Sequence, residues 1–202
     1  MSLVIVNTRC ANLASVDFAF RRLGVVPRIS ADPKIIRGAS HVVLPGVGTA
    51  NAAMRALHEL NLVEVLQTLT QPVLGICLGM QMLTNTSSEQ RTGKPLGCLG
   101  VIDTQIDRLR KHANLPLPHM GWNATTLGDH PLFKGFDASS AYFYYVHTYA
   151  APVDASTIAT CEYSQPFAAA IGQNNFMGVQ FHPERSGEPG AQVLQNFLEI
   201  SC

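Results

Sequence analysis

The sequence predicts an α/β fold: one domain over residues 1–202, with a central, mostly parallel or mixed sheet and helices on both faces. Three observations indicate this fold. In the first half, short β-rich runs alternate with helical segments, the order that gives a parallel sheet covered on both sides. In the second half, strand-like segments follow one another with turn signals such as "GQNN" between them. With 202 residues, 47% of them hydrophobic, the chain is long enough for a well-buried core.

The first half supplies the parallel part of the sheet. Runs of β-branched and other apolar residues predict strands at 3–7, 25–30, 41–46 and 72–76. Apolar spacing and helix-forming residues predict helices at 11–24, 49–69 and 78–84. The second of these segments favours two helices broken near Asn61.

The second half adds strands of a different kind. We predict strands at 141–150, 156–163, 167–173 and 176–184, and a closing helix at 190–200. Because these strands are joined by short turns rather than by helices, this half of the sheet is expected to be mixed or antiparallel.

Charge and composition exclude several classes of function. The formal net charge is zero at pH 7, so no basic stripe indicates a nucleic-acid partner. No apolar run is long enough for a membrane span, and no leader-like segment opens the chain, which favours the cytoplasm. The five cysteines are scattered and odd in number, which is typical of reduced thiols: Cys10, Cys77, Cys98, Cys161 and Cys202. None forms a C-x-x-C pair, so we do not expect a zinc site. The sequence implies no other metal and no organic cofactor.

One cysteine occupies a special position. In "GICLG", Cys77 lies between a predicted strand and a predicted helix and is flanked by glycines at 75 and 79. This is the nucleophile elbow, with cysteine in place of serine, after a central strand. Such a turn lifts the sulfur to the carboxyl edge of the sheet, and the helix N-terminus favours the thiolate. The other cysteines are expected to be inert.

A base and its orienting group follow in "FHPE". In an extended segment, residues two apart face the same side, so His182 and Glu184 can point the same way. Glu184 would then orient the imidazole while its other nitrogen faces Cys77, as in a catalytic triad.

Acyl transfer also needs an oxyanion hole. One donor is the backbone N–H of Leu78, which follows the nucleophile. The glycine-rich segment "LPGVGTA" (44–50) offers a second, from Val47 or Gly48. Taken singly, each of these residues also fits a structural role, and His147 in "YYVHTY" is open between packing and function. The combination favours catalysis.

The segments "GICLGMQ" (75–81) and "GVQFHPE" (178–184) together resemble the class I, or triad, glutamine amidotransferases. Three further segments narrow the resemblance to glutaminase subunits of imidazole glycerol phosphate synthase: "LPGVGTA", "LPLPHMGWN" (115–123) and "YFYYVHTYA" (142–150). The resemblance spans essentially the whole chain and implies a class I amidotransferase fold.

The resemblance implies a site and a substrate. Cys77 would attack the side-chain amide of L-glutamine, His182 would transfer protons, and Glu184 would orient His182. Gln81 and the backbone of Thr148 and Tyr149 would hold the glutamine, with Gly46 beside it.

The resemblance also implies a partner, a (β/α)₈-barrel cyclase subunit that receives the ammonia. Trp122 is the only tryptophan of the chain, and tryptophan is a frequent interface anchor. We therefore expect His119, Met120, Trp122 and Asn123 at or near that interface. The chain departs from the family pattern at Asn7 and Arg9, in a loop near the carboxyl edge of the first strand.

Three other interpretations stay open from the sequence. The chain could serve another acceptor, as in anthranilate or purine synthesis, which "PHMGWN" and "YYVHTY" argue against. It could be a stand-alone cysteine hydrolase of γ-glutamyl compounds, active without a partner. A non-enzymatic thiol-sensing domain would need only Cys77 and would leave "HPE" unexplained.

Overall fold

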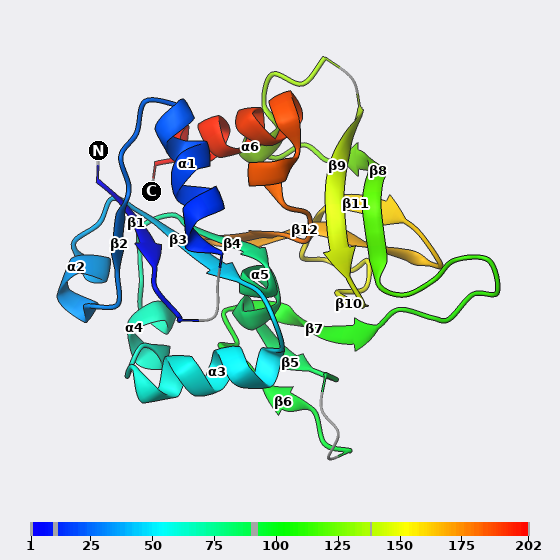
Figure 1. Ribbon diagram of the computed structural model, residues 1–202, viewed down its shortest axis with the longest axis horizontal. Coiled ribbons are helices and arrows are strands. Elements are labelled where there is room, and N and C mark those ends of the chain that lie inside the picture. Colours follow the sequence, from blue (N-terminus) through cyan, green and yellow to red (C-terminus); the bar gives the residue numbers. More distant parts are fainter. Residues whose placement is uncertain (1, 10–11, 90–92, 138, 202) are drawn as a thin grey trace.

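A nine-stranded sheet runs through the part of the chain that the computed structural model describes, residues 2–9, 12–89, 93–137 and 139–201 (Figure 1). Its first five strands are parallel neighbours, in the order β2 (Arg28–Ser30), β1 (Leu3–Val6), β3 (His41–Gly46), β4 (Val73–Cys77) and β13 (Phe176–Val179). The remaining four are antiparallel, in the order β12 (Pro166–Gln173), β11 (Thr157–Glu162), β8 (His119–Leu127) and β9 (Ser140–His147). The predicted mixed sheet is confirmed.

Helices cover both faces of the parallel half. The helices α1 (Leu13–Arg22) and α6 (Gly187–Glu199) pack on one hydrophobic cluster, above the sheet in Figure 1. The other face carries α2 (Pro33–Arg37), α3 (Ala50–Glu59), α4 (Val63–Gln67) and α5 (Leu78–Leu83). Alternation along β1 explains the two clusters, because Leu3 and Ile5 join the first and Val4 and Val6 the second.

A second, four-stranded sheet lies beside the first, in the order β10 (Tyr149–Ala150), β7 (Ile102–Arg108), β5 (Thr84–Ser87) and β6 (Leu96–Gly97). The sequence predicts no element between residues 85 and 140, so the structure shows four strands, β5 to β8, that the sequence pattern did not predict. The predicted strand 141–150 is divided at Thr148 into β9 and β10, which belong to different sheets. This division places Tyr149 in the second sheet, paired with Arg108 of β7, directly after the edge strand β9 of the main sheet.

Other predicted boundaries shift for local reasons. The helical segment 49–69 breaks as expected, and Asn61 adopts a left-handed φ of 53° at the break. The predicted strand 176–184 ends at Val179, and Pro183 opens a short 3₁₀ turn, Pro183–Arg185. A second such turn spans Pro131–Phe133. The predicted first helix begins at Leu13, while Ala11 lies outside the described residues.

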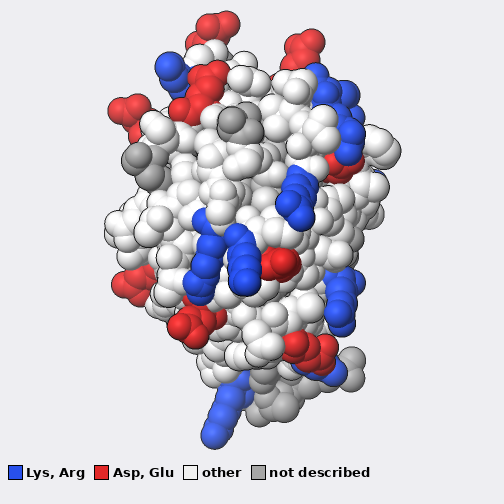
Figure 2. Space-filling view, turned by 90° about the vertical axis from the view of Figure 1, so that its left-hand side faces the viewer, with Lys and Arg blue, Asp and Glu red and all other residues white. Residues whose placement is uncertain are grey.

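Charged side chains of both signs are spread over the face shown in Figure 2, with broad uncharged areas between them. This face carries the β2 edge of the sheet, on the left of Figure 1. Among the described residues, no helix is long and apolar enough to cross a membrane.

Candidate active site

Cys77 lies at a strained turn between β4 and α5. Its φ of 53° and ψ of −111° are an unfavourable backbone conformation for a residue with a Cβ, and such strain is often found at active sites. The flanking glycines do not themselves adopt the left-handed φ; they are needed because another part of the backbone lies too close for a side chain. A Cβ on Gly79 would lie 1.7 Å from the carbonyl oxygen of Leu44, and one on Gly75 would lie 2.6 Å from the nitrogen of Met80. The glycines therefore let α5 pack directly on β3 and β4, while Cys77 itself makes the turn.

His182 reaches the nucleophile because of strand pairing. β13 pairs with β4 in parallel, with Val179 opposite Ile76, so the chain leaving β13 passes beside Cys77. The backbone N–H of His182 then donates to the carbonyl of Tyr144 in β9 at 2.9 Å. Ser186 strengthens this link, because its hydroxyl donates to the His182 carbonyl at 2.7 Å and accepts from the Tyr144 N–H at 3.0 Å.

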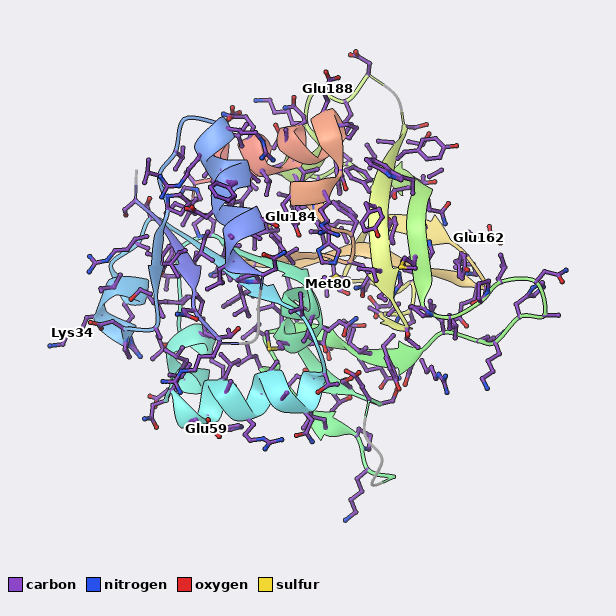
Figure 3. The ribbon with its side chains drawn as sticks, viewed as in Figure 1. Lys34, Glu59, Met80, Glu162, Glu184 and Glu188 are labelled. Carbon is purple, nitrogen blue, oxygen red and sulfur yellow. The ribbon has the colours of Figure 1, made fainter. Side chains whose placement is uncertain are left out.

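The histidine is held by a carboxylate. His182 Nδ1 lies 2.8 Å from Oε1 of Glu184, and both side chains are more than nine-tenths buried. Figure 3 shows Glu184 near the middle of the molecule, between α1 and β9. With Nδ1 occupied, Nε2 of His182 is left for the sulfur, and it has no hydrogen-bond partner among the described residues.

Electrostatics favours a charged imidazole here. Burial opposes the positive charge, but the Cys77 side chain and the Glu184 carboxylate outweigh it and raise the pKa of His182 from 6.5 to about 10. A histidine that keeps its proton beside a cysteine favours a thiolate–imidazolium pair, the reactive form of such sites.

A cavity of about 430 Å³ opens above the elbow. It is lined by all ten residues that the sequence predicts for catalysis and glutamine binding: Gly46, Val47, Gly48, Cys77, Leu78, Gln81, Thr148, Tyr149, His182 and Glu184. Gly48 has a left-handed φ of 94°, and Val47 beside it is partly exposed. Four separate segments of the sequence thus converge on one space.

Several polar residues at this site are not identified by the sequence reasoning: Asn12, Glu89 and Arg185 line the cavity, and Gln180 lies beside Cys77. Glu89 lines the cavity, where burial raises the pKa of its carboxyl group, although the N–H of Ala50 at 2.8 Å opposes this. Gln180 is fully buried beside Cys77. For Gln180, the sequence offers one sign of a buried polar role: a glutamine between two apolar residues in "VQF". For Glu89 it offers no sign, because its contact Ala50 lies 39 positions away in the sequence.

Gln81 has a more restricted role than the resemblance implies. Its Nε2 donates to the Tyr149 carbonyl at 2.9 Å and to Oε1 of Gln180 at 3.0 Å. Both side-chain N–H groups are therefore used within the protein, and only the Oε1 acceptor remains for a ligand.

The four predicted interface residues lie outside the cavity, on β8. Alternation along the strand separates them: Met120 and Trp122 are 66% and 55% exposed, whereas His119 is 2% exposed. His119 therefore lies in the layer beneath the exposed face that carries Met120 and Trp122, and the expected place of all four at or near a partner interface stays a prediction. Asn123 also turns inward, with Nδ2 3.3 Å from His119 Nε2 and 2.9 Å from the carbonyl of Glu162.

The open question about His147 has a structural answer. Its Nδ1 donates to the Tyr149 carbonyl at 3.0 Å, and its Nε2 accepts from His119 Nδ1 at 3.0 Å. Burial, and secondarily His119, lowers the pKa of His147 to about 3, and burial lowers that of His119 to about 4. Both rings are neutral near pH 7; His147 lines the cavity and supports the Tyr149 backbone, and His119 supports His147 in turn.

The remaining cysteines fit packing roles. Burial raises the pKa of both Cys98 and Cys161 to about 11, so they stay protonated near pH 7. Cys10 and Cys202 lie outside the described residues. In the described ranges, no group of three His, Cys, Asp or Glu side chains could hold a metal ion.

The two residues that depart from the family pattern form a local turn. Arg9 has a left-handed φ of 60°, and its N–H donates to the side chain of Asn7 at 3.1 Å. Neither lines the cavity.

The elbow, the histidine–carboxylate pair and the cavity define an α/β enzyme of the cysteine-nucleophile class. Comparison with known proteins gives the family. The class-I glutamine amidotransferase family matches residues 17–200. The chain is similar to the HisH subunit of imidazole glycerol phosphate synthase from Shewanella loihica, at 52% identity over 205 residues, covering 98% of this chain and 91% of the relative. It is also similar to HisH from Vibrio cholerae, at 50% identity and 98% coverage of both.

Solved structures agree on the fold. A glutamine amidotransferase crystal structure matches with a TM-score of 0.74 at 17% identity, over 97% of both chains. The structure of PurLQS from Thermotoga maritima matches with a TM-score of 0.70 at 17% identity, over 98% of this chain and 97% of that one. The chain belongs to the class-I glutamine amidotransferase family and, within it, to the family of HisH subunits. The predicted fold class and family are confirmed.

Proposed function

We propose that the chain, acting as one domain over residues 1–202, is the glutaminase subunit of imidazole glycerol phosphate synthase. It hydrolyses L-glutamine to glutamate and ammonia through a cysteinyl thioester. The observation that carries the proposal is the buried His182–Glu184 pair at 2.8 Å, with the free Nε2 beside a cysteine on a strained elbow that opens into a 430 Å³ cavity.

The chemistry follows from these groups. The Cys77 proton passes to His182 Nε2, and the thiolate attacks the side-chain amide carbon of glutamine. The N–H groups of Leu78 and of the 47–48 segment stabilise the oxyanion that forms. His182 returns its proton to the departing ammonia, leaving a glutamyl thioester. The same histidine then takes a proton from water, which releases glutamate and restores the thiol.

Substrate recognition needs groups for both ends of glutamine. Besides Glu184, which is paired with His182, Glu89 is the carboxylate that lines the cavity among the described residues. One Glu89 oxygen accepts from Ala50, so the other is available to the substrate α-ammonium. The Oε1 of Gln81 adds a second acceptor, and the 148–149 backbone adds further polar groups.

The ammonia goes to a cyclase subunit, which makes imidazole glycerol phosphate and aminoimidazole-carboxamide ribonucleotide in cytoplasmic histidine biosynthesis. The support is the naming of the relatives and an exposed apolar face on β8 and β9. Strand pairing sets Met120 beside Val146 and Trp122 beside Tyr144 on that face, and Tyr142 extends it. Contiguous exposed apolar residues of this kind are typical of a protein-binding site.

The test is glutamate release from glutamine by the purified chain, alone and with its cyclase plus a substrate analogue. We expect low activity that rises with the partner and disappears in Cys77→Ala. Equal, high activity without the partner would instead indicate a stand-alone hydrolase, and stimulation by a different acceptor enzyme would indicate another amidotransferase.

A further inference from the structure

Gln180 is a fully buried carboxamide for which the mechanism above has no use. It lies between the end of β13 and the catalytic histidine and is 0% exposed. A buried amide is costly unless its polar atoms are paired. Its Nε2 lies 3.7 Å from the sulfur of Cys77, within range for an N–H to sulfur hydrogen bond, and its Oε1 accepts from Gln81.

A backbone carbonyl fixes which way this amide points. The Tyr149 carbonyl can only accept, so the side-chain atom of Gln81 facing it at 2.9 Å must be the nitrogen. The same nitrogen donates to Gln180 at 3.0 Å, so the facing atom of Gln180 must be its oxygen. The nitrogen of Gln180 is then the atom that faces Cys77, and the opposite rotamer would place two donors against each other.

Besides His182, the sulfur has two polar neighbours with opposite preferences. The Val146 carbonyl, 3.9 Å from the sulfur, can accept a hydrogen bond from the thiol but offers nothing to a thiolate. The Gln180 N–H can donate to the thiol and to the thiolate. Its hydrogen bond to the thiolate is the stronger one, because hydrogen bonds to charged groups are stronger. When the proton moves to His182, the first contact is lost and the second strengthens.

We propose that Gln180 is a positioning residue for the nucleophile: its carboxamide, locked by Gln81 and the Tyr149 carbonyl, holds the Cys77 sulfur in place and favours its thiolate. The inference rests on the proposed function only in what the thiolate is used for. It goes beyond the triad and the oxyanion hole by giving the sulfur a donor of its own.

The test measures the thiolate directly. The full chain is alkylated with iodoacetamide across a pH series, and mass spectrometry of the Cys77 peptide gives the midpoint of its pH–rate curve. Gln180→Met removes the donor at similar volume. Gln180→Leu removes the donor with a different apolar shape and without adding a charge, so it decides the question alone if Gln180→Met does not fold. Asn196→Leu is the control, because Asn196 is an equally buried amide that bonds Leu132 and Lys134 instead.

We expect the Cys77 midpoint to rise by about one pH unit in Gln180→Met and in Gln180→Leu, the size of one hydrogen bond to a charged atom. Asn196→Leu should leave it in place. An unchanged midpoint in the Gln180 variants, or an equal shift in Asn196→Leu, would overturn the inference. If the Gln180 variants show these shifts but the wild-type chain does not turn over glutamine alongside the cyclase, the proposed function is overturned and the inference still stands.

Discussion

The buried pair His119 and His147 should make folding stability fall steeply as the pH drops below 6.5. Burial holds the pKa of His119 at about 4 and that of His147 at about 3, against 6.5 in an unfolded chain. Between these values the unfolded chain binds two protons that the folded chain does not, so acid favours unfolding. Each such proton is worth at most about 1.4 kcal/mol per pH unit, or about 2.7 kcal/mol per unit for the pair.

The neighbouring titrations allow this window to be isolated. The pKa of His182 is raised to about 10, so its stabilising contribution is complete below about pH 6.5 and is lost only as the pH rises toward 10. Burial also lowers the pKa of His130 and raises that of Glu89, which act in opposite directions in acid. The contributions of His130 and Glu89 are the same in wild type and in a His147 variant, so they cancel when the free energy of unfolding of one is subtracted from that of the other.

The variant is His147→Gln, which keeps a donor and an acceptor but does not titrate. Urea unfolding followed by circular dichroism, from about pH 7 to about pH 5, gives the free energy of unfolding at each pH. The variant should lose stability less steeply than wild type, by about 1.4 kcal/mol per pH unit once the unfolded histidine is charged. His58→Gln, at an exposed position of α3, is the control for replacing any histidine. Parallel curves for wild type and His147→Gln would refute the argument that a buried neutral histidine sets this slope.

Three further variants test packing, partner binding and substrate recognition. Gly79→Ala would put a Cβ 1.7 Å from a backbone carbonyl oxygen, so we expect a loss above about 4 kcal/mol in urea unfolding, against less than about 1 kcal/mol for Gly97→Ala, where a Cβ meets nothing within 4 Å. Trp122→Ala should weaken cyclase binding about 30-fold by calorimetry, while Val26→Ala, at a more exposed apolar position beside the opposite edge of the sheet, should not change it. Glu89→Gln should raise the KM for glutamine tenfold or more in a glutamate-release assay, because a charge-assisted contact to the ammonium is lost; an unchanged KM would exclude Glu89 from the substrate site.

The elbow was predictable from sequence because its geometry depends on local spacing. Two glycines around Cys77 at the end of an apolar run specify a strand, a sharp turn and a helix within seven residues. His182 and Glu184 were identified as a pair from their two-residue spacing, but not for the reason given by an extended segment: Glu184 lies in the 3₁₀ turn Pro183–Arg185, and that turn brings its Oε1 2.8 Å from His182 Nδ1.

The parts that sequence reasoning missed depend on contacts between distant segments. Strand β7 alternates buried and exposed residues in "IDTQIDR". It was not predicted from the sequence because its many polar residues resemble those of a loop. Glu89 becomes a site residue only because β5 brings it to the start of α3. Both His119 and Trp122 belong to one motif, and only the register of β8 against β9 decides which of them faces the core.

Strand β9 connects the exposed face to the catalytic groups through the same residues. Tyr144 and Val146 lie on the face beside Trp122 and Met120, while their carbonyls contact the His182 N–H at 2.9 Å and the Cys77 sulfur at 3.9 Å. Such an edge strand has backbone groups free for contacts outside the sheet, and here they go to the catalytic residues.

A partner seated on this face would therefore act on the backbone that positions the nucleophile and its base. Ser186→Ala tests this link, because it deletes the hydroxyl that joins the Tyr144 N–H to the His182 carbonyl and leaves the exposed face unchanged. We expect cyclase affinity within about twofold of wild type, since no contact residue is altered, together with a severalfold loss of partner-stimulated glutaminase activity. Ser156→Ala, which removes an equally buried hydroxyl bonded to Asp154 away from β9, is the control. If Ser186→Ala instead weakens binding and leaves the activity of the saturated complex intact, β9 acts as a docking strand alone and the coupling to His182 through its backbone is wrong.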